Sequence, residues 1–157
     1  MIVLFDIDGT LLLAGGAGRD ALVHALDLHL PVKGAMDRVV CAGKTDLLIV
    51  EEACQNATGD LPDAAMVERV LQTYTEVLPA EIARNLNFRL MPGVPEVIEE
   101  LERRPGCALA VATGNIAAGA DAKLRRAGLR EQLARGGYGD GTRDRTEILQ
   151  RAIDDLS

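Results

Sequence analysis

The sequence predicts an α/β fold whose parallel sheet is interrupted by a helical insert. Two short apolar runs, Ile2–Phe5 and Cys107–Ala112, each end at a polar turn, which is typical of buried parallel strands. Between these runs, apolar side chains recur at helical spacing from about residue 19 to residue 90. Strands that alternate with helices favour a parallel sheet with right-handed crossovers. We therefore expect residues 1–14 and 91–157 to form one core and residues 15–90 a helical domain.

The first strand is followed by a loop, a glycine-rich joint and three expected helices. Asp6–Thr10 is the loop, and Ala14–Gly18 is a flexible joint whose glycines lack the spacing of a dinucleotide-binding fingerprint. One helix follows Arg19, a second is capped by Thr45, and a third begins near Pro62. Their apolar faces comprise Ala21, Leu22, Ala25, Leu26, Leu28, Leu47, Leu48, Ile49, Val50, Met66, Val67, Val70, Leu71 and Tyr74. We expect no strong strand in this region.

The second half of the chain returns to alternating helices and strands. Met91-Pro92-Gly93 marks the boundary, and residues 94–101 form an amphipathic helix that Pro105-Gly106 stops. The strand at residues 107–112 ends at a turn, and a helix over residues 116–127 follows it. The remaining elements are a loop over residues 136–141, with room for a short strand before it, and a last helix over residues 143–156.

Charge and composition argue against several classes of protein. A net charge of −7 disfavours a nucleic-acid-binding surface, which needs a basic field. No apolar run approaches the roughly 18 residues that span a membrane, and the start of the chain has no basic leader. We therefore expect a cytoplasmic protein without a membrane partner. Cys41, Cys54 and Cys107 lack metal-ligand spacing, so they are expected to be reduced thiols.

Two carboxylates follow the first strand directly. Asp6 and Asp8 stand two residues apart, so their side chains face the same side of an extended segment, at a strand end where open α/β sheets bind ligands. Adjacent carboxylates repel each other unless one of them is protonated or a cation lies between them. Mg²⁺ fits this position because it prefers oxygen ligands and keeps phosphate in its shell. A calcium-binding EF-hand loop does not fit, because Thr10 and Leu12 do not continue its ligand pattern.

The turn Thr113-Gly114-Asn115 supplies a second, complementary feature. It ends a strand and opens a helix, so a hydroxyl group and free backbone N–H groups are expected to form a phosphate cradle. A rival phosphate motif at Gly43-Lys44-Thr45 fails, because the P-loop pattern requires glycine where this chain has Arg38. The residues that follow the two predicted strands are therefore the candidate catalytic and phosphate-binding residues.

These motifs resemble those of the haloacid dehalogenase-like hydrolase superfamily, in particular its phosphoglycolate-phosphatase-like branch. Phe5-Asp6-Ile7-Asp8-Gly9-Thr10-Leu11-Leu12 resembles the first family motif, and Thr113-Gly114-Asn115 resembles the second. Met91-Pro92-Gly93-Val94 resembles the return of the chain into the core. The resemblance covers nearly the whole chain, and it implies a Rossmann-like core with an inserted all-helical cap.

The resemblance implies a Mg²⁺-dependent phosphatase that acts on small phosphorylated metabolites. Asp6 would attack phosphorus and form an aspartyl-phosphate, and Asp8 would serve as general acid and base. Asp6 and Asp8 would also hold the Mg²⁺ ion. Thr113, Gly114 and Asn115 would bind the phosphoryl oxygens. An acid at position 8 favours phosphate esters over the substrates of dehalogenases.

The third family motif is a basic residue near the phosphate. Arg145 is the preferred candidate, because it follows a glycine-rich loop at about the right distance from Thr113. Lys123 lies roughly 12 Å along its helix at 1.5 Å per residue, so we expect it to face away. Lys44, in the helical insert, is a candidate for substrate specificity. A solvated side chain is the alternative interpretation of both Arg145 and Lys44.

The fourth family motif, a strand that ends in a Gly-Asp pair with a further metal-binding Asp, has no counterpart after Gly141. We therefore expect a core truncated at its C-terminus, weak metal binding, and an unpaired apolar edge at Ile2–Phe5 that favours self-association. Two alternative functions stay open. One is a sugar phosphomutase of the same superfamily, and the other is an inactive binding module.

Overall fold

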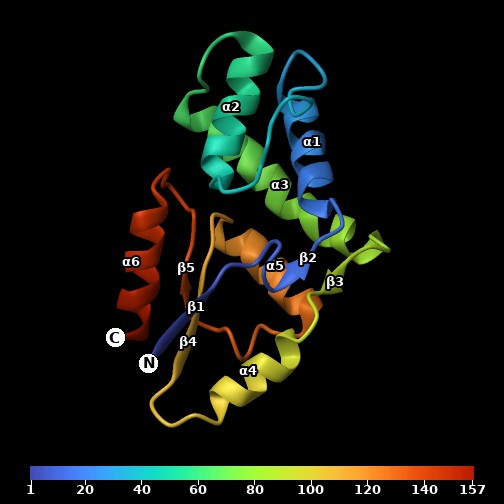
Figure 1. The fold of residues 1–157 in the computed structure, drawn as a ribbon. Coiled ribbons are helices and arrows are strands. Elements are labelled where there is room, and N and C mark those ends of the chain that lie inside the picture. The colour runs from blue at the N-terminus through green and yellow to red at the C-terminus, as the bar shows by residue number, and fades with distance from the viewer.

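The computed structural model describes all residues, 1–157, and contains a sheet with helices on both faces and a helical layer above it (Figure 1). The sheet consists of β1 (Ile2–Phe5), β4 (Ala108–Ala112) and β5 (Gly136–Gly137), in the order β1-β4-β5. Both pairs of neighbouring strands are parallel. The structure therefore confirms the predicted α/β fold with a parallel sheet.

Side chains alternate across β1 and β4, so each face of the sheet packs against different helices. Leu4 and Ala112 pack against α6, whereas Phe5 and Val111 belong to a cluster with α4 and α5. Figure 1 shows α6 on one side of the sheet and α5 on the other. These helices lie within two residues of their predicted ends: α4 (Val94–Glu102), α5 (Ala117–Ala127) and α6 (Arg145–Leu156).

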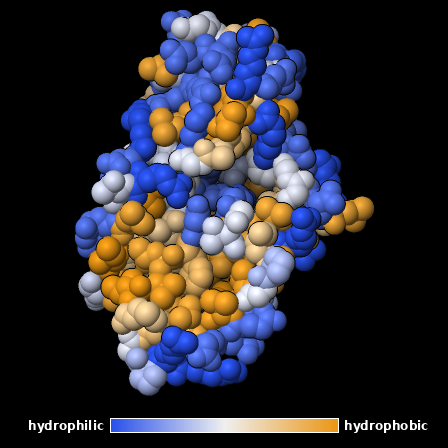
Figure 2. Space-filling model, in the orientation of Figure 1, coloured by the Kyte–Doolittle hydropathy of each residue, from blue (hydrophilic) through white to orange (hydrophobic).

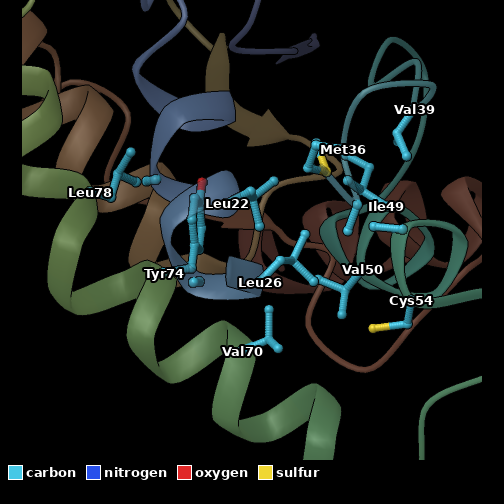
Figure 3. Close-up of a cluster of buried hydrophobic side chains, with 14 of the residues drawn as sticks. Leu22, Leu26, Met36, Val39, Ile49, Val50, Cys54, Val70, Tyr74 and Leu78 are labelled. Carbon is cyan, nitrogen blue, oxygen red and sulfur yellow. The ribbon is translucent and has the colours of Figure 1, made fainter. Parts of the chain in front are cut away.

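Three helices form a layer over the carboxyl ends of the strands (Figure 1). They are α1 (Ala17–His29), α2 (Asp46–Thr58) and α3 (Ala64–Arg84). Their apolar faces meet in a cluster of 18 buried residues, part of which Figure 3 shows. The Thr45 hydroxyl accepts a hydrogen bond from the Leu48 N–H at 3.3 Å, which confirms the predicted cap of α2. None of the helices combines the length and the apolarity that crossing a membrane requires.

Two chain segments join the sheet to the helical layer, and they pair with each other. β2 (Leu12–Leu13) and β3 (Arg89–Leu90) form a two-stranded antiparallel sheet. The sequence shows no strong strand pattern between residues 19 and 90, and β3, with two residues, is too short to show an alternating pattern. Near these strands, the Gly15 carbonyl accepts a hydrogen bond from Asn85 Nδ2 at 3.0 Å. The glycine-rich joint is thus fixed at this point.

β1 lies at a free edge of the sheet, as the sequence predicts. It pairs with β4 and with no other strand. Ile2 is 51% exposed, and Figure 2 shows apolar surface gathered over the lower half of the molecule, where Figure 1 places β1. An unpaired apolar edge of this kind is a surface to which another strand can add.

Candidate active site

The parallel register of β1 and β4 brings the two predicted motifs to one edge of the sheet. Phe5 pairs with Val111, so the residues that follow each of them emerge side by side. A cavity of about 470 Å³ lies there, between the sheet and the helical layer. On the sheet side it is lined by Asp6, Asp8, Thr113, Gly114, Asn115, Lys123 and Arg145. On the other side it is lined by groups of the helical layer that include Arg19, Lys44, Asp46 and Tyr74.

Asp6 is the first carboxylate after β1, and it remains accessible to water. Its Oδ1 accepts a hydrogen bond from the Ile7 N–H at 2.8 Å, and its Oδ2 accepts one from Arg145 Nη2 at 3.3 Å. The side chains of Asp6 and Arg145 are 39% and 42% exposed, so this ion pair adds little stability. The structure therefore places Arg145 beside Asp6, where the sequence led us to expect a basic residue.

Asp8 contacts a different cation, Lys123. The Lys123 ammonium donates hydrogen bonds to Oδ1 and Oδ2 of Asp8, at 2.9 and 2.8 Å, and to Oδ1 of Asn115 at 2.7 Å. Asn115 Nδ2 closes the network by donating to Asp8 Oδ2 at 2.8 Å. Lys123 is only 4% exposed, and these three contacts use all three of its N–H donors.

The expectation that Lys123 faces away from the site is therefore wrong. Residues 116 and 123 are seven apart, so they share one face of α5. Helical side chains also point back toward the N-terminus of their helix. The long lysine stem runs along α5 in that direction, and its ammonium group reaches the turn that precedes the helix. An estimate from the rise of the backbone leaves out the length and direction of the side chain.

Hydrogen bonds within the turn Thr113–Asn115 hold its conformation. The Thr113 hydroxyl oxygen accepts hydrogen bonds from the N–H and from Nδ2 of Asn115, at 3.3 and 2.7 Å. The Gly114 N–H has no partner among the backbone hydrogen bonds of the turns and loops. This N–H and the proton of the Thr113 hydroxyl are therefore the donors that the turn offers to an incoming anion.

The next two N–H groups, at the start of α5, are occupied by carboxylates of the protein itself. Ile116 donates to Asp46 Oδ2 at 2.8 Å, and Ala117 donates to Asp140 Oδ2 at 2.7 Å. These acids take the place that an external anion would otherwise have at a helix N-terminus. The phosphate cradle therefore has fewer free N–H donors than the sequence predicts.

Asp46 also connects the helical layer to the turn Thr113–Asn115 through a hydrogen bond. Its N–H donates to the Gly114 carbonyl at 2.9 Å, and a Cβ atom at Gly114 would overlap the Lys44 carbonyl. Burial raises the pKa of Asp46 to about 6, and this effect outweighs the hydrogen bond from Ile116, which lowers the pKa. Sequence reasoning missed Asp46, because an acid in the first turn of a helix is ordinarily explained by the helix dipole.

Comparison with known protein families identifies the family of this chain. The haloacid dehalogenase-like hydrolases match residues 1–156. The chain belongs to the haloacid dehalogenase-like hydrolase family. No curated protein sequence matches this hydrolase.

Several solved structures share the fold of this hydrolase. CbbY from Rhodobacter sphaeroides, in complex with phosphate, has a TM-score of 0.75 and 23% identity over 99% of this chain and 72% of that chain. A predicted phosphoglycolate phosphatase from Haemophilus somnus has a TM-score of 0.64 and 20% identity over 92% of this chain and 64% of that chain. A hydrolase from Pseudomonas syringae has a TM-score of 0.71 and 19% identity over 98% and 69%. The hydrolase therefore spans 64–72% of the length of these chains.

Lys44 lines the cavity of the hydrolase, but its charge is engaged within the helical layer. Its ammonium group pairs with Glu52 of α2, and its side chain is 30% exposed. Nearby, Arg143 pairs with Glu51 of α2 and links the helical layer to the segment before α6. The structure thus places Lys44 at the cavity wall and gives its ammonium group a partner within the protein.

Asp6 and Asp8 provide the oxygen donors by which this hydrolase would hold Mg²⁺. The ion binds one or two carboxylates, keeps several water molecules and takes oxygen atoms from substrate phosphate. No cluster of three or more acidic, His or Cys side chains is present. The donor set therefore fits Mg²⁺ chemically, but a substrate phosphate and water must complete the coordination shell.

Proposed function

We propose that this hydrolase is a Mg²⁺-dependent phosphatase of small phosphorylated metabolites that reacts through an aspartyl-phosphate on Asp6. One observation carries the proposal. The carboxylates after β1 and the hydroxyl turn after β4 border the same cavity, and Asn115 Nδ2 lies 2.8 Å from Asp8 Oδ2. A nucleophile, an acid–base group and anion-binding donors therefore surround one space of suitable size for a small ester.

The reaction would have two steps. In the first step, an Asp6 oxygen bonds to phosphorus, the ester P–O bond breaks, and Asp8 gives its proton to the leaving oxygen. In the second step, Asp8 takes a proton from water, the water oxygen bonds to phosphorus, and the bond to Asp6 breaks. Phosphate leaves with both carboxyl groups restored to their starting forms.

The surrounding residues have separate tasks in these steps. The Gly114 N–H and the Thr113 hydroxyl would bind the phosphoryl oxygens, and Arg145 would bind phosphate next to Asp6. Lys123 and Asn115 hold the Asp8 carboxylate in place through hydrogen bonds of 2.8–2.9 Å. Asp6 and Asp8 are the residues that would hold Mg²⁺, and the bound ion would supply Lewis-acid chemistry that offsets negative charge.

We infer that residues 15–90 act as a cap that closes over the substrate. Asp46 of this region is hydrogen-bonded to the turn that would hold the phosphate. The fold neighbour CbbY has been crystallised with phosphate and, as a mutant, with xylulose-(1,5)bisphosphate. Substrates of that kind, small phosphorylated sugars and related metabolites, are therefore the first to test.

Release of phosphate from p-nitrophenyl phosphate tests the proposal. We expect turnover that requires added Mg²⁺, is abolished by EDTA, and is lost in Asp6→Asn. Asp60→Asn is the matched control, because Asp60 is exposed and lies outside the cavity. Turnover that persists in Asp6→Asn, or that needs no metal, would show that the proposed chemistry is wrong.

A second candidate function is a phosphate-binding module without turnover. The absence of a three-carboxylate cluster favours it, because the metal would then be held by few protein ligands. Calorimetric titration with Mg²⁺ and beryllium fluoride separates the candidates. A phosphatase should bind the mimic at Asp6 and lose this binding in Asp6→Asn, whereas no detectable binding of the mimic favours the module without turnover.

A further inference from the structure

Tyr74 is a buried aromatic side chain at the junction of the helical layer and the sheet domain. It lies on α3, is 1% exposed, and is among the largest fully buried side chains of the molecule. Figure 3 shows its ring standing among Leu22, Leu26 and Leu78, with the hydroxyl oxygen at the end of the ring away from Val70. The ring therefore contributes to the core, and its polar end requires a separate explanation.

The hydroxyl group of Tyr74 has no partner within the protein. It takes part in none of the side-chain hydrogen bonds of the structure, yet no fully enclosed polar side-chain atom is left without a partner. Tyr74 also lines the cavity of the active site. The hydroxyl must therefore open into that cavity, because a tyrosine that is otherwise buried normally satisfies its O–H.

Two glycines pack close to the hydroxyl, where a larger residue would crowd it. A Cβ atom at Gly119 of α5 would lie 3.1 Å from the Tyr74 hydroxyl oxygen. A Cβ atom at Gly18 of α1 would lie 4.0 Å from that oxygen and 3.6 Å from Lys123 Nζ. The hydroxyl and the ammonium group thus approach the same point, and Lys123 is hydrogen-bonded to Asp8. Tyr74 therefore reaches the side of the cavity where Asp8 would meet the leaving group.

The hydroxyl is also kept in its protonated form. Burial raises the pKa of Tyr74 well above 10, and the negative charges of Asp46 and Asp8 raise it further. A neutral O–H in this position is a hydrogen-bond donor throughout the neutral pH range. This O–H group therefore complements an oxygen acceptor on the substrate better than it complements an apolar substrate group.

We propose that Tyr74 is a specificity-determining residue whose hydroxyl donates a hydrogen bond to the organic part of the substrate. The proposal rests on the proposed phosphatase function and narrows its substrate class. The preferred esters carry a hydroxyl, carbonyl or carboxylate oxygen close to the ester bond. Esters whose organic part is purely apolar leave the buried O–H without a partner, and they are disfavoured.

Kinetics with matched variants test this assignment. Tyr74→Phe removes only the hydroxyl, and Tyr138→Phe is the control, because Tyr138 is the other tyrosine of the chain and does not line the cavity. We would measure kcat/KM for glycerol 1-phosphate, 3-phosphoglycerate and glucose 6-phosphate, and for phenyl phosphate as the apolar ester. Thermal melting of each variant confirms that the fold is retained.

The expected result is a change in selectivity. Wild type should prefer at least one polar ester to phenyl phosphate, and Tyr74→Phe should lower kcat/KM for that ester about tenfold while phenyl phosphate changes less than about twofold. Tyr138→Phe should change neither value. Equal effects of Tyr74→Phe on both kinds of ester, no effect on either, or a wild-type preference for phenyl phosphate would overturn the proposal.

A binding experiment separates this proposal from the proposed hydrolysis. The chain has no Trp and two Tyr, so Tyr74 is the only strong fluorophore in an Asp6→Asn, Tyr138→Phe double variant. Titration with the same polar esters should change tyrosine emission saturably, and phenyl phosphate should change it less. An unchanged emission overturns the role of Tyr74. A saturable change in a chain whose wild type releases no phosphate overturns hydrolysis and leaves the role of Tyr74 intact.

Discussion

Replacement of Lys123 by Met is expected to destabilise the protein and to disorder the acid–base group. The ammonium of Lys123 makes its three hydrogen bonds to Asp8 and Asn115 while 5% of its side chain is exposed. Methionine keeps most of the aliphatic stem but carries no charge. Asp8 then loses its cation and keeps only the hydrogen bond from Asn115.

The size of the effect follows from the unequal burial of the two partners. Removing one partner of a fully buried ion pair costs about 3–5 kcal/mol. The side chain of Asp8 is 46% exposed, so water can replace part of the lost interaction. We therefore expect a loss of about 1–3 kcal/mol in the free energy of unfolding, or a fall of about 2–12 °C in Tm.

Urea unfolding and thermal melting measure this loss. Lys33→Met is the matched control, because Lys33 is exposed and makes one hydrogen bond, to the Asp27 carbonyl. The control should melt within about 1 °C of wild type, since surface changes of this kind are small. If Lys123→Met is as stable as wild type or more stable, the ammonium group does not hold Asp8 in the folded state.

Two further predictions concern Asp46 and the sheet edge. The pKa of Asp46, about 6 in the folded protein against an ordinary 3.8, means that the folded state binds this proton more tightly than the unfolded chain. Its contribution to stability is full below about pH 4 and is lost as the pH rises through about 6, by about 2–3 kcal/mol in total. Asp46→Asn should abolish this part of the pH dependence, so urea midpoints of wild type and variant that run parallel from pH 4 to pH 7 would contradict the assignment. At the sheet edge, we expect concentration-dependent association by light scattering, which Ile2→Lys should suppress because it places a charge on the free strand β1. Association of equal strength in Ile2→Lys would place the contact elsewhere.

The order of strands and helices was predictable because it depends on patterns within short segments. Apolar runs that end in polar turns gave β1 and β4, and periods of three to four residues gave the helices. The two-residue strand Arg89–Leu90 was missed, because two residues carry no period. The free edge of β1 was predicted from a missing family motif, and the order of the strands agrees with it.

The positions of Asp6, Asp8 and the Thr113 turn could be predicted from local sequence patterns, because parallel neighbouring strands end at the same edge of their sheet. Which side chains of the helical layer reach that edge depends instead on how the helices pack in the folded protein. Asp46 and Tyr74 face the cavity because α2 and α3 pack across the sheet domain at particular angles. Packing between elements distant in sequence sets those angles, and no local pattern records them. Lys123 combines both situations. The helix that carries it was predictable from local periodicity, but the direction of its side chain, toward Asp8, is set by the tertiary structure.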